Sequence, residues 1–503
     1  MRPRNQSRFS LSGYLEKAII GQKLNNVTGV AIIAALAILF GYLVSRQTFL
    51  GFGLFGVVLG FFTIVTCMIN TEVGLYINLA YAFFAFHFSR FLFQDAFPVG
   101  VVTDVLIGAT FISLLVRGSN LKKSFSDFSK TSVGIAILVF LFYLVIELAN
   151  PFGQTFEGWF QTFRRFLGSV VLLYVAFNIF TSYEKIRRFV IVLFVLCTVV
   201  GLYACIQQVH GLFDFEIAWV TATENRFGLI YIGGEFRKFS TMSDPTAFGI
   251  LMAACSLFFS IVCLQLKNPW HRIILISGIA VMLLGMAFSG TRTANVMIAA
   301  GVVMFILLSF NKQRTRMFSF VAAGLFCVLL YGPFYGNQTI NRFRSSFIGS
   351  EDESFKVREV NRALIQPYIY EHPIGGGLGT SGAGGLMYSP GHRLAGFPPD
   401  SGYLKKALET GWIGLGIICI LYFTILKSAI KGYFRSRVDD YKIIFAGIIA
   451  FLFSFYVAEF AQDAIGQITD LVVYYPMIAI MLRLKYIEHS PTEGAQQTEL
   501  EAT

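Results

Sequence analysis

The sequence is poor in charge: only 14% of its 503 residues are Asp, Glu, Lys or Arg, against about a quarter in ordinary soluble domains. Its 13 prolines are few beside 54 phenylalanines and 22 tyrosines, which excludes a disordered or low-complexity chain. With 55% hydrophobic residues and a mean hydropathy of +0.65, the composition also excludes a soluble multidomain enzyme. We therefore expect an integral membrane protein with many spans.

Long basic runs are missing as well. Lys and Arg exceed Asp and Glu by 11, but the surplus is scattered between apolar stretches and does not predict nucleic-acid binding. The seven cysteines all lie in apolar stretches, so neither a disulfide framework nor a metal site is expected. Residues 1–26 are polar and basic without the apolar core of a signal peptide, so the first span is expected to stay in the protein.

Apolar runs long enough to cross a bilayer as helices recur along the chain. They lack the alternation of barrel strands, which predicts an all-α polytopic membrane protein with about 14 transmembrane helices. The runs cover 28–45, 49–69, 73–93, 97–116, 131–149, 166–182, 189–209, 245–266, 273–290, 294–310, 317–335, 402–426, 442–461 and 468–484. His87, Arg90 and Asp104 interrupt the third and fourth runs. Asp104 is either a functional intramembrane residue or a partner for Arg90.

The distribution of basic residues predicts the orientation. With both termini inside, 24 of the 40 Lys and Arg fall in inner segments and five in short outer loops, so the positive-inside rule places both termini in the cytoplasm. The expected division is a cytoplasmic segment 1–27, a transmembrane catalytic unit 28–484 and a cytoplasmic tail 485–503.

Two long outer segments, 210–244 and 336–401, remain within the transmembrane unit. A structureless loop of the second one's length would be unusual, so it is expected to carry helices and a site. The stretch from Phe355 to Tyr370 predicts an amphipathic helix. Its apolar stripe consists of Val357, Val360, Leu364, Ile365 and Tyr368, and Arg358 and Arg362 share one face.

Four motifs lie at the predicted outer surface. Ser289-Gly290-Thr291-Arg292 is a short turn between two runs, and Arg292 is either a snorkelling side chain or a phosphate ligand. Arg237 and Lys238 precede Asp244-Pro245, where a helix cap is the simpler interpretation of the aspartate.

The other two motifs lie in and after the second long segment. The glycines from Gly375 to Gly379 indicate either tight turns or close backbone approach to a substrate. They lack the Gly-Lys-Ser/Thr ending of a nucleotide-binding loop. Asp400 precedes Ser401-Gly402-Tyr403 and is either a helix cap or a general base. His372 precedes Pro373 in the second long segment, while His87 and His210 have no partner at a spacing that suits a metal.

The ordered set of motifs resembles the bacterial O-antigen ligase/polymerase superfamily (Wzy and WaaL type). It runs from Arg237 to Asp244-Pro245, then Ser289 to Arg292, Arg358 to the glycines after His372, and Asp400 to Leu415. The resemblance implies a metal-independent glycosyltransferase of the GT-C kind, without a cofactor. Its donor would be a glycan on undecaprenyl diphosphate, used on the periplasmic face of the bacterial inner membrane.

The same resemblance implies roles for individual residues. Arg237 and Arg292 would bind the diphosphate, and Arg358 or Arg362 would contact glycan or phosphate. His372 and Tyr403 would contribute to substrate binding, and Asp400 and Arg292 to catalysis. Fixed positive charge on the leaving diphosphate replaces a metal ion in such a reaction.

Asp400-Ser401 stands where ligases of this family have His-Asn, which favours a polymerase of O-antigen or exopolysaccharide repeat units over a ligase that acts on lipid A core or protein. A flippase for lipid-linked oligosaccharide is the alternative from another class, but it should show repeated halves and charges at the membrane midplane. The partners expected are lipid-linked glycan and membrane lipid, with a flippase and a chain-length regulator as candidates. No nucleic acid is expected.

Overall fold

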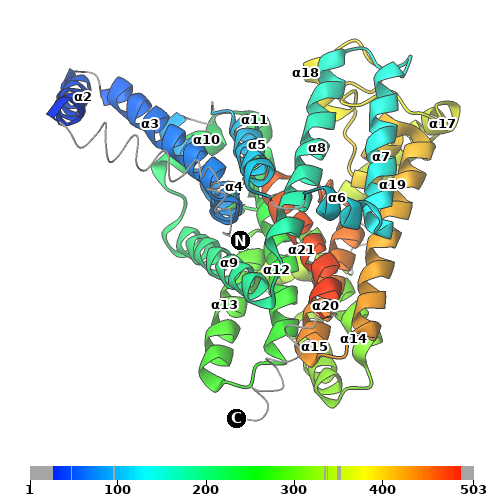
Figure 1. The fold of residues 1–503 in the computed structure, drawn as a ribbon. Coiled ribbons are helices and arrows are strands. Elements are labelled where there is room, and N and C mark those ends of the chain that lie inside the picture. The colour runs from blue at the N-terminus through cyan, green and yellow to red at the C-terminus, as the bar shows by residue number, and fades with distance from the viewer. Residues whose placement is uncertain are drawn as a thin grey trace.

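The chain is a bundle of long helices with almost no sheet (Figure 1). The computed structural model describes residues 27–46, 48–93, 97–118, 121–333, 336, 338–347 and 353–488. Most of the predicted segments 1–27 and 485–503 therefore lie outside the described residues. The all-α prediction is confirmed.

Each of the fourteen predicted runs corresponds to one long helix. These helices are α2 (Val27–Arg46), α3 (Thr48–Ile69), α4 (Thr71–Phe93), α5 (Val99–Arg117), α7 (Ser132–Ile146, continued by the 3-10 turn η2, Glu147–Ala149), α8 (Phe156–Ile179), α9 (Tyr183–His210), α12 (Pro245–Cys263), α13 (Pro269–Phe288), α14 (Arg292–Ser309), α15 (Gln313–Tyr331), α19 (Gly402–Arg435), α20 (Asp439–Ala458) and α21 (Ile468–Ile487). Ten of them, among the residues described, are long and apolar enough to cross a membrane. The protein is thus a multi-pass membrane protein, and the total of fourteen spans stays a prediction.

Local sequence signals set several helix ends. Asp244 caps α12 through hydrogen bonds from the next backbone N–H groups, and Pro245 occupies the first helical position. Asn268 and Pro269 start α13 in the same way. These pairs satisfy donors that a helix leaves unpaired at its N-terminus. Hydropathy alone places the start of α8 ten residues too late, at 166, because its first turns carry polar residues such as Arg164.

The most deeply packed helices are α12, α20 and α21, whose side chains are largely buried on all sides. A helix that is apolar and buried all round lies inside a bundle. Around them stand α8, α9, α13, α14 and α19, while α2 and α3 extend away from the rest (Figure 1). Many outward side chains of α3 are apolar and exposed, as expected for lipid-facing positions.

The two predicted outer segments contain short elements of their own. The first has α10 (Asp214–Thr221), α11 (Glu224–Ile230) and a hairpin of β1 (Tyr231–Ile232) with β2 (Glu235–Phe236). The second has α16 (Gln338–Ser345), α17 (Glu353–Glu371) and α18 (Gly382–Tyr388), and the short α6 (Leu121–Ser129) precedes α7.

The predicted amphipathic helix is α17, but only part of its predicted apolar stripe is buried. Ile365 and Tyr368 are buried, whereas Val360 is 57% and Leu364 68% exposed. The buried pair packs on the 392–408 region, and this contact covers a narrower face than the sequence stripe suggests. The side chain of Val357 lies outside the described residues.

Candidate functional site

Arg237 directly follows the β1–β2 hairpin. Its turn residues Gly233 and Gly234 have φ of 64° and 86°, a conformation that suits glycine and closes a two-residue hairpin. The Arg237 guanidinium reaches the turn between α13 and α14. Nε donates to the Ser289 carbonyl at 2.9 Å and Nη2 to the Thr291 hydroxyl at 3.1 Å. The two basic motifs of the sequence are therefore in direct contact.

Arg292, the first residue of α14, and Arg342 of α16 lie close enough to Arg237 for their charges to act on it. Arg342 Nη2 donates to the Ile232 carbonyl at 2.6 Å. Its guanidinium also packs against Gly290, which has a φ of 60° and leaves room for it by having no side chain. We call Arg237, Arg292 and Arg342 the arginine cluster.

The charges of the arginine cluster outnumber the carboxylates near them. Burial, together with the charge of Arg342, lowers the pKa of Arg237 to about 10 against the attraction of Asp244. Burial also lowers the pKa of Arg342, although Glu235 opposes the shift. An anion bound here would relieve both the lost hydration and the repulsion among the arginines. Guanidinium groups match phosphate oxygens in shape, so the cluster is suited to a phosphate-bearing ligand.

A buried arginine from α4 anchors the loop that carries Arg237. Arg90 donates to the carbonyl of Met242 and, at 3.0 Å, to that of Ser243, and its guanidinium lies 4.2 Å from the centre of the Trp219 ring. The interpretation that Arg90 pairs with Asp104 is therefore wrong. Asp104 forms its ion pair with Arg164 of α8, because α5 packs directly against that helix.

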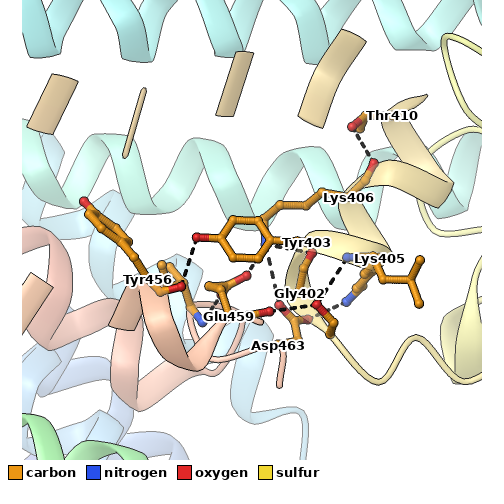
Figure 2. Close-up of polar contacts among 11 residues, drawn as sticks. Gly402, Tyr403, Lys405, Lys406, Thr410, Tyr456, Glu459 and Asp463 are labelled. Atoms are coloured by element: carbon orange, nitrogen blue, oxygen red, sulfur yellow. Dashed lines mark hydrogen bonds and ion pairs between the residues drawn. The ribbon is translucent and has the colours of Figure 1, made fainter. Parts of the chain in front are cut away.

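A second charged group lies at the start of α19, and we call it the lysine–carboxylate cluster (Figure 2). Lys405 Nζ lies 2.7 Å from an oxygen of Asp463, and Lys406 Nζ lies 2.8 Å from an oxygen of Glu459. Glu459 is fully buried. The positive charges of the two lysines outweigh burial and lower the pKa of Asp463 to about 2. A mostly apolar cavity of about 140 Å³ between α7, α8, α19 and α21 borders Lys405, Lys406 and Asp463.

Asp400 and Tyr403 lie beside the lysine–carboxylate cluster. Ser401 caps α19 and donates through its hydroxyl to the Glu459 carbonyl at 2.9 Å. This fixes the chain next to Asp400, which is itself partly exposed. The Tyr403 hydroxyl donates to the Tyr456 carbonyl of α20 at 3.0 Å, as Figure 2 shows. Tyr403 thus has a structural contact, whereas its predicted role in substrate binding stays a prediction.

The connection between α20 and α21, residues 459–467, contacts both the start of α19 and the chain before α12. At one end Glu459 holds the start of α19. At the other, the hydroxyl of Ser243 donates to Gln467 at 3.5 Å, next to the Asp244 cap of α12. The segment 459–467 therefore lies against the chain beside Asp400 and against the end of the loop that carries Arg237.

His372 and Arg362, two other predicted site residues, contact aromatic side chains of the protein. His372 stacks on Tyr368, with ring centres 4.0 Å apart, and meets the edge of Phe152. Arg362 donates to the Phe460 carbonyl at 3.1 Å and covers the Phe460 ring. Arg358 belongs to α17, and its side chain lies outside the described residues.

The glycine-rich loop approaches other parts of the protein itself. Gly376 and Gly377 donate through their N–H groups to the carbonyls of Leu408 and Glu409, at 2.8 and 3.0 Å. A Cβ on Gly377, whose φ is 94°, would lie 2.6 Å from Gly153. These contacts support the interpretation as tight turns at Gly376 and Gly377, because their N–H groups are already paired within the protein.

Sequence reasoning missed Arg342. The signal was present, since Arg342 and Arg344 lie on a short polar stretch just after a predicted span, but nothing in the local pattern distinguishes them from Arg358 and Arg362. Within the described part of the chain, no three His, Cys, Asp or Glu side chains are grouped so that they could hold a metal ion.

Comparison with known proteins shows that part of this site is similar to a known family. Residues 277–419, which include Arg292, Arg342 and Asp400, match the family model of the O-antigen ligase. An O-antigen polymerase of Salmonella muenchen is 24% identical over 266 residues, which cover 50% of this chain and 62% of the relative. The predicted resemblance to the O-antigen ligase/polymerase superfamily is confirmed.

Proposed function

We propose that this protein, which resembles the O-antigen ligase/polymerase superfamily, is a polymerase of O-antigen or exopolysaccharide repeat units. It would transfer glycan from undecaprenyl diphosphate on the periplasmic face of a bacterial inner membrane, with both termini in the cytoplasm. The observation that carries the proposal is the convergence of Arg237, Arg292 and Arg342 from three separate segments. Similarity to an O-antigen polymerase supports it.

In the proposed reaction, a sugar hydroxyl of one repeat unit attacks the anomeric carbon of another. The bond from that carbon to the diphosphate breaks, and the diphosphate leaves with the bonding electrons. Arg237, Arg292 and Arg342 would stabilise the charge that develops on it, so that no metal is required. Asp400 would take the proton of the attacking hydroxyl.

The ligase stays the second candidate, because the matching family model is that of the O-antigen ligase. In that case the acceptor would be lipid A core or a protein in place of a second repeat unit. The presence of Asp400-Ser401 where ligases have His-Asn favours the polymerase.

The test uses purified protein in lipid vesicles with an undecaprenyl-diphosphate-linked repeat unit and a chelator, followed by gel electrophoresis. We expect a ladder of glycan lengths. In a parallel reaction that also contains lipid A core as an acceptor, transfer of glycan to that acceptor without a ladder would indicate the ligase. Movement of the carrier lipid between leaflets without a new glycosidic bond would indicate a flippase and refute the catalytic roles.

Arg292→Lys examines the role of the guanidinium. Lysine keeps the positive charge and can still snorkel, but it loses the planar fork that binds two phosphate oxygens. We expect activity to fall by about 10- to 100-fold, in line with a charge-assisted hydrogen bond worth about 1.5–3 kcal/mol. Arg316→Lys in α15, an exposed position outside the arginine cluster, is the matched control. Full activity of Arg292→Lys would refute diphosphate binding by Arg292.

A further inference from the structure

A second basic site lies at the opposite end of α19 and α21 from the two clusters described above. A cavity of about 820 Å³ is bordered by the side chains of five cations, a size within the range of ligand pockets. The cations come from three segments: Lys130 from the chain before α7, Lys427, Lys431 and Arg435 from α19, and Lys485 from α21. No carboxylate is among the lining residues that the structure describes.

The position of the cavity corresponds to the other face of the membrane. The backbone of α19 breaks at Gly411, whose φ is 67°, and Lys431 follows this break by 20 positions, which at 1.5 Å per residue spans about 30 Å of continuous helix. A bilayer's hydrocarbon core is about 30 Å thick. The cavity therefore lies at headgroup level on the side opposite the arginine cluster. The distribution of basic residues assigns the side of the cavity to the cytoplasm.

The lining of the cavity is built by several elements together and is not simply a row of lysines that extend toward water. Lys427, Lys431 and Arg435 recur at intervals of four along one face of α19, and this face looks toward the N-terminus of α7. There Thr131 and Ser132 line the cavity, and the positive end of the helix dipole adds to the field. Lys485 is oriented into the site by a hydrogen bond from its Nζ to the Ser428 hydroxyl at 2.7 Å.

Apolar side chains complete one wall. Phe423, which is 63% exposed, and Leu482 border the cavity on the side that continues into the membrane. A ligand with phosphate at one end and hydrocarbon at the other could therefore contact the basic side chains and the apolar wall at the same time. Basic pockets between transmembrane helices on the cytoplasmic side are suited to anionic phospholipid headgroups.

We propose that this cavity binds the headgroup of an anionic phospholipid of the cytoplasmic leaflet, with Lys130, Lys427, Lys431, Arg435 and Lys485 around its phosphate. The site is independent of the proposed polymerase chemistry. Through α19 and α21 it would link the lipid composition of one leaflet to the helices that carry the lysine–carboxylate cluster at the other.

The test measures lipid binding to the purified full-length protein by native mass spectrometry in detergent, with titrations of cardiolipin, phosphatidylglycerol and phosphatidylcholine. Each cation near an anionic lipid contributes about a fivefold gain in affinity. Lys431→Gln with Arg435→Gln should therefore weaken binding of the two anionic lipids by about 30-fold. The effect on phosphatidylcholine should be small.

Two further variants act as controls. Lys122→Gln with Lys123→Gln removes the same charge from α6, at the same end of the bundle but outside the cavity, and should leave binding near that of the wild type. Lys431→Arg with Arg435→Lys keeps the charge and should retain most of the affinity. Equal loss in the α6 variant, or no loss in the cavity variant, would overturn the proposal.

Soluble glycerol phosphate distinguishes a lipid from a free anion. We expect it to compete with cardiolipin only weakly, because it cannot contact Phe423 and Leu482. Competition at the same concentration as the lipid would show that the cavity binds a free phosphate compound, and the assignment to a phospholipid would be wrong.

Discussion

Gly402→Ala should disrupt the lysine–carboxylate cluster by adding a single methyl group. A Cβ at this position would lie 2.6 Å from Cδ of Glu459 and would overlap the carboxylate oxygen that binds Lys406. Glu459 has no space to withdraw, since its side chain is fully buried and its other oxygen accepts from the Ile465 N–H at 2.7 Å. The Gly402 backbone is itself tied to the Gln462 carbonyl. The ion pair in Figure 2 must therefore break.

The size of the effect follows from the burial of the pair. Breaking a buried ion pair costs about 3–5 kcal/mol. Lys406 keeps 20% of its side chain exposed and has Asp463 at 3.9 Å as a second partner, which places the cost at the lower end. Alanine recovers about 0.5–1 kcal/mol over glycine in a helix, so the unfolding free energy should fall by about 2 kcal/mol.

The assay is reversible unfolding in mixed micelles, with the denaturing detergent increased stepwise and helix content followed by circular dichroism. Gly416→Ala is the matched control on the same helix, because its Cβ would meet no atom within 4 Å, and it should be neutral or slightly stabilising. Combined with Glu459→Ala, the change at Gly402 should cost nothing more, since the clash is gone. Wild-type stability of Gly402→Ala, or strict additivity in the double variant, would refute the reasoning.

Three further results are expected. The pKa of Asp463 is lower in the fold than its ordinary value of 3.8, so its pairing with Lys405 contributes about 2 kcal/mol of stability above about pH 4, which is lost as the pH falls toward 2. In Asp463→Asn, the unfolding free energy should therefore depend less on pH between 4 and 2 than in the wild type. Gly290→Ala should displace Arg342 and strain a backbone with φ of 60°, lowering polymerisation at least 10-fold while Gly416→Ala keeps full activity; equal activities would contradict the arginine cluster. Arg90→Met should leave the Ser243 carbonyl without its donor, at a cost of about 1–3 kcal/mol, and should speed proteolysis of the 231–244 loop; an unchanged digestion rate would show that Arg90 does not anchor it.

A feature could be predicted from the sequence when the interacting residues lie close together in the chain. Hydropathy located the long helices because each must present an apolar surface along its own length to lipid or to neighbouring helices. The Asp244-Pro245 pair placed the start of α12 because capping is a contact between near neighbours in the chain. Arg237 and Arg292 were predicted as site residues from short motifs of the same range, and their roles stay predictions.

The convergence of these motifs was decided by the tertiary structure. Arg342 joins Arg237 from 105 positions away, and no periodicity distinguishes it from Arg358 or Arg362. Arg90 binds loop carbonyls some 150 positions distant instead of Asp104, since a buried guanidinium takes the acceptors that packing brings to it. By itself the sequence indicated the long helices and the capped start of α12. Only the packing of distant segments decided which charges meet, because contacts between them leave no local pattern in the chain.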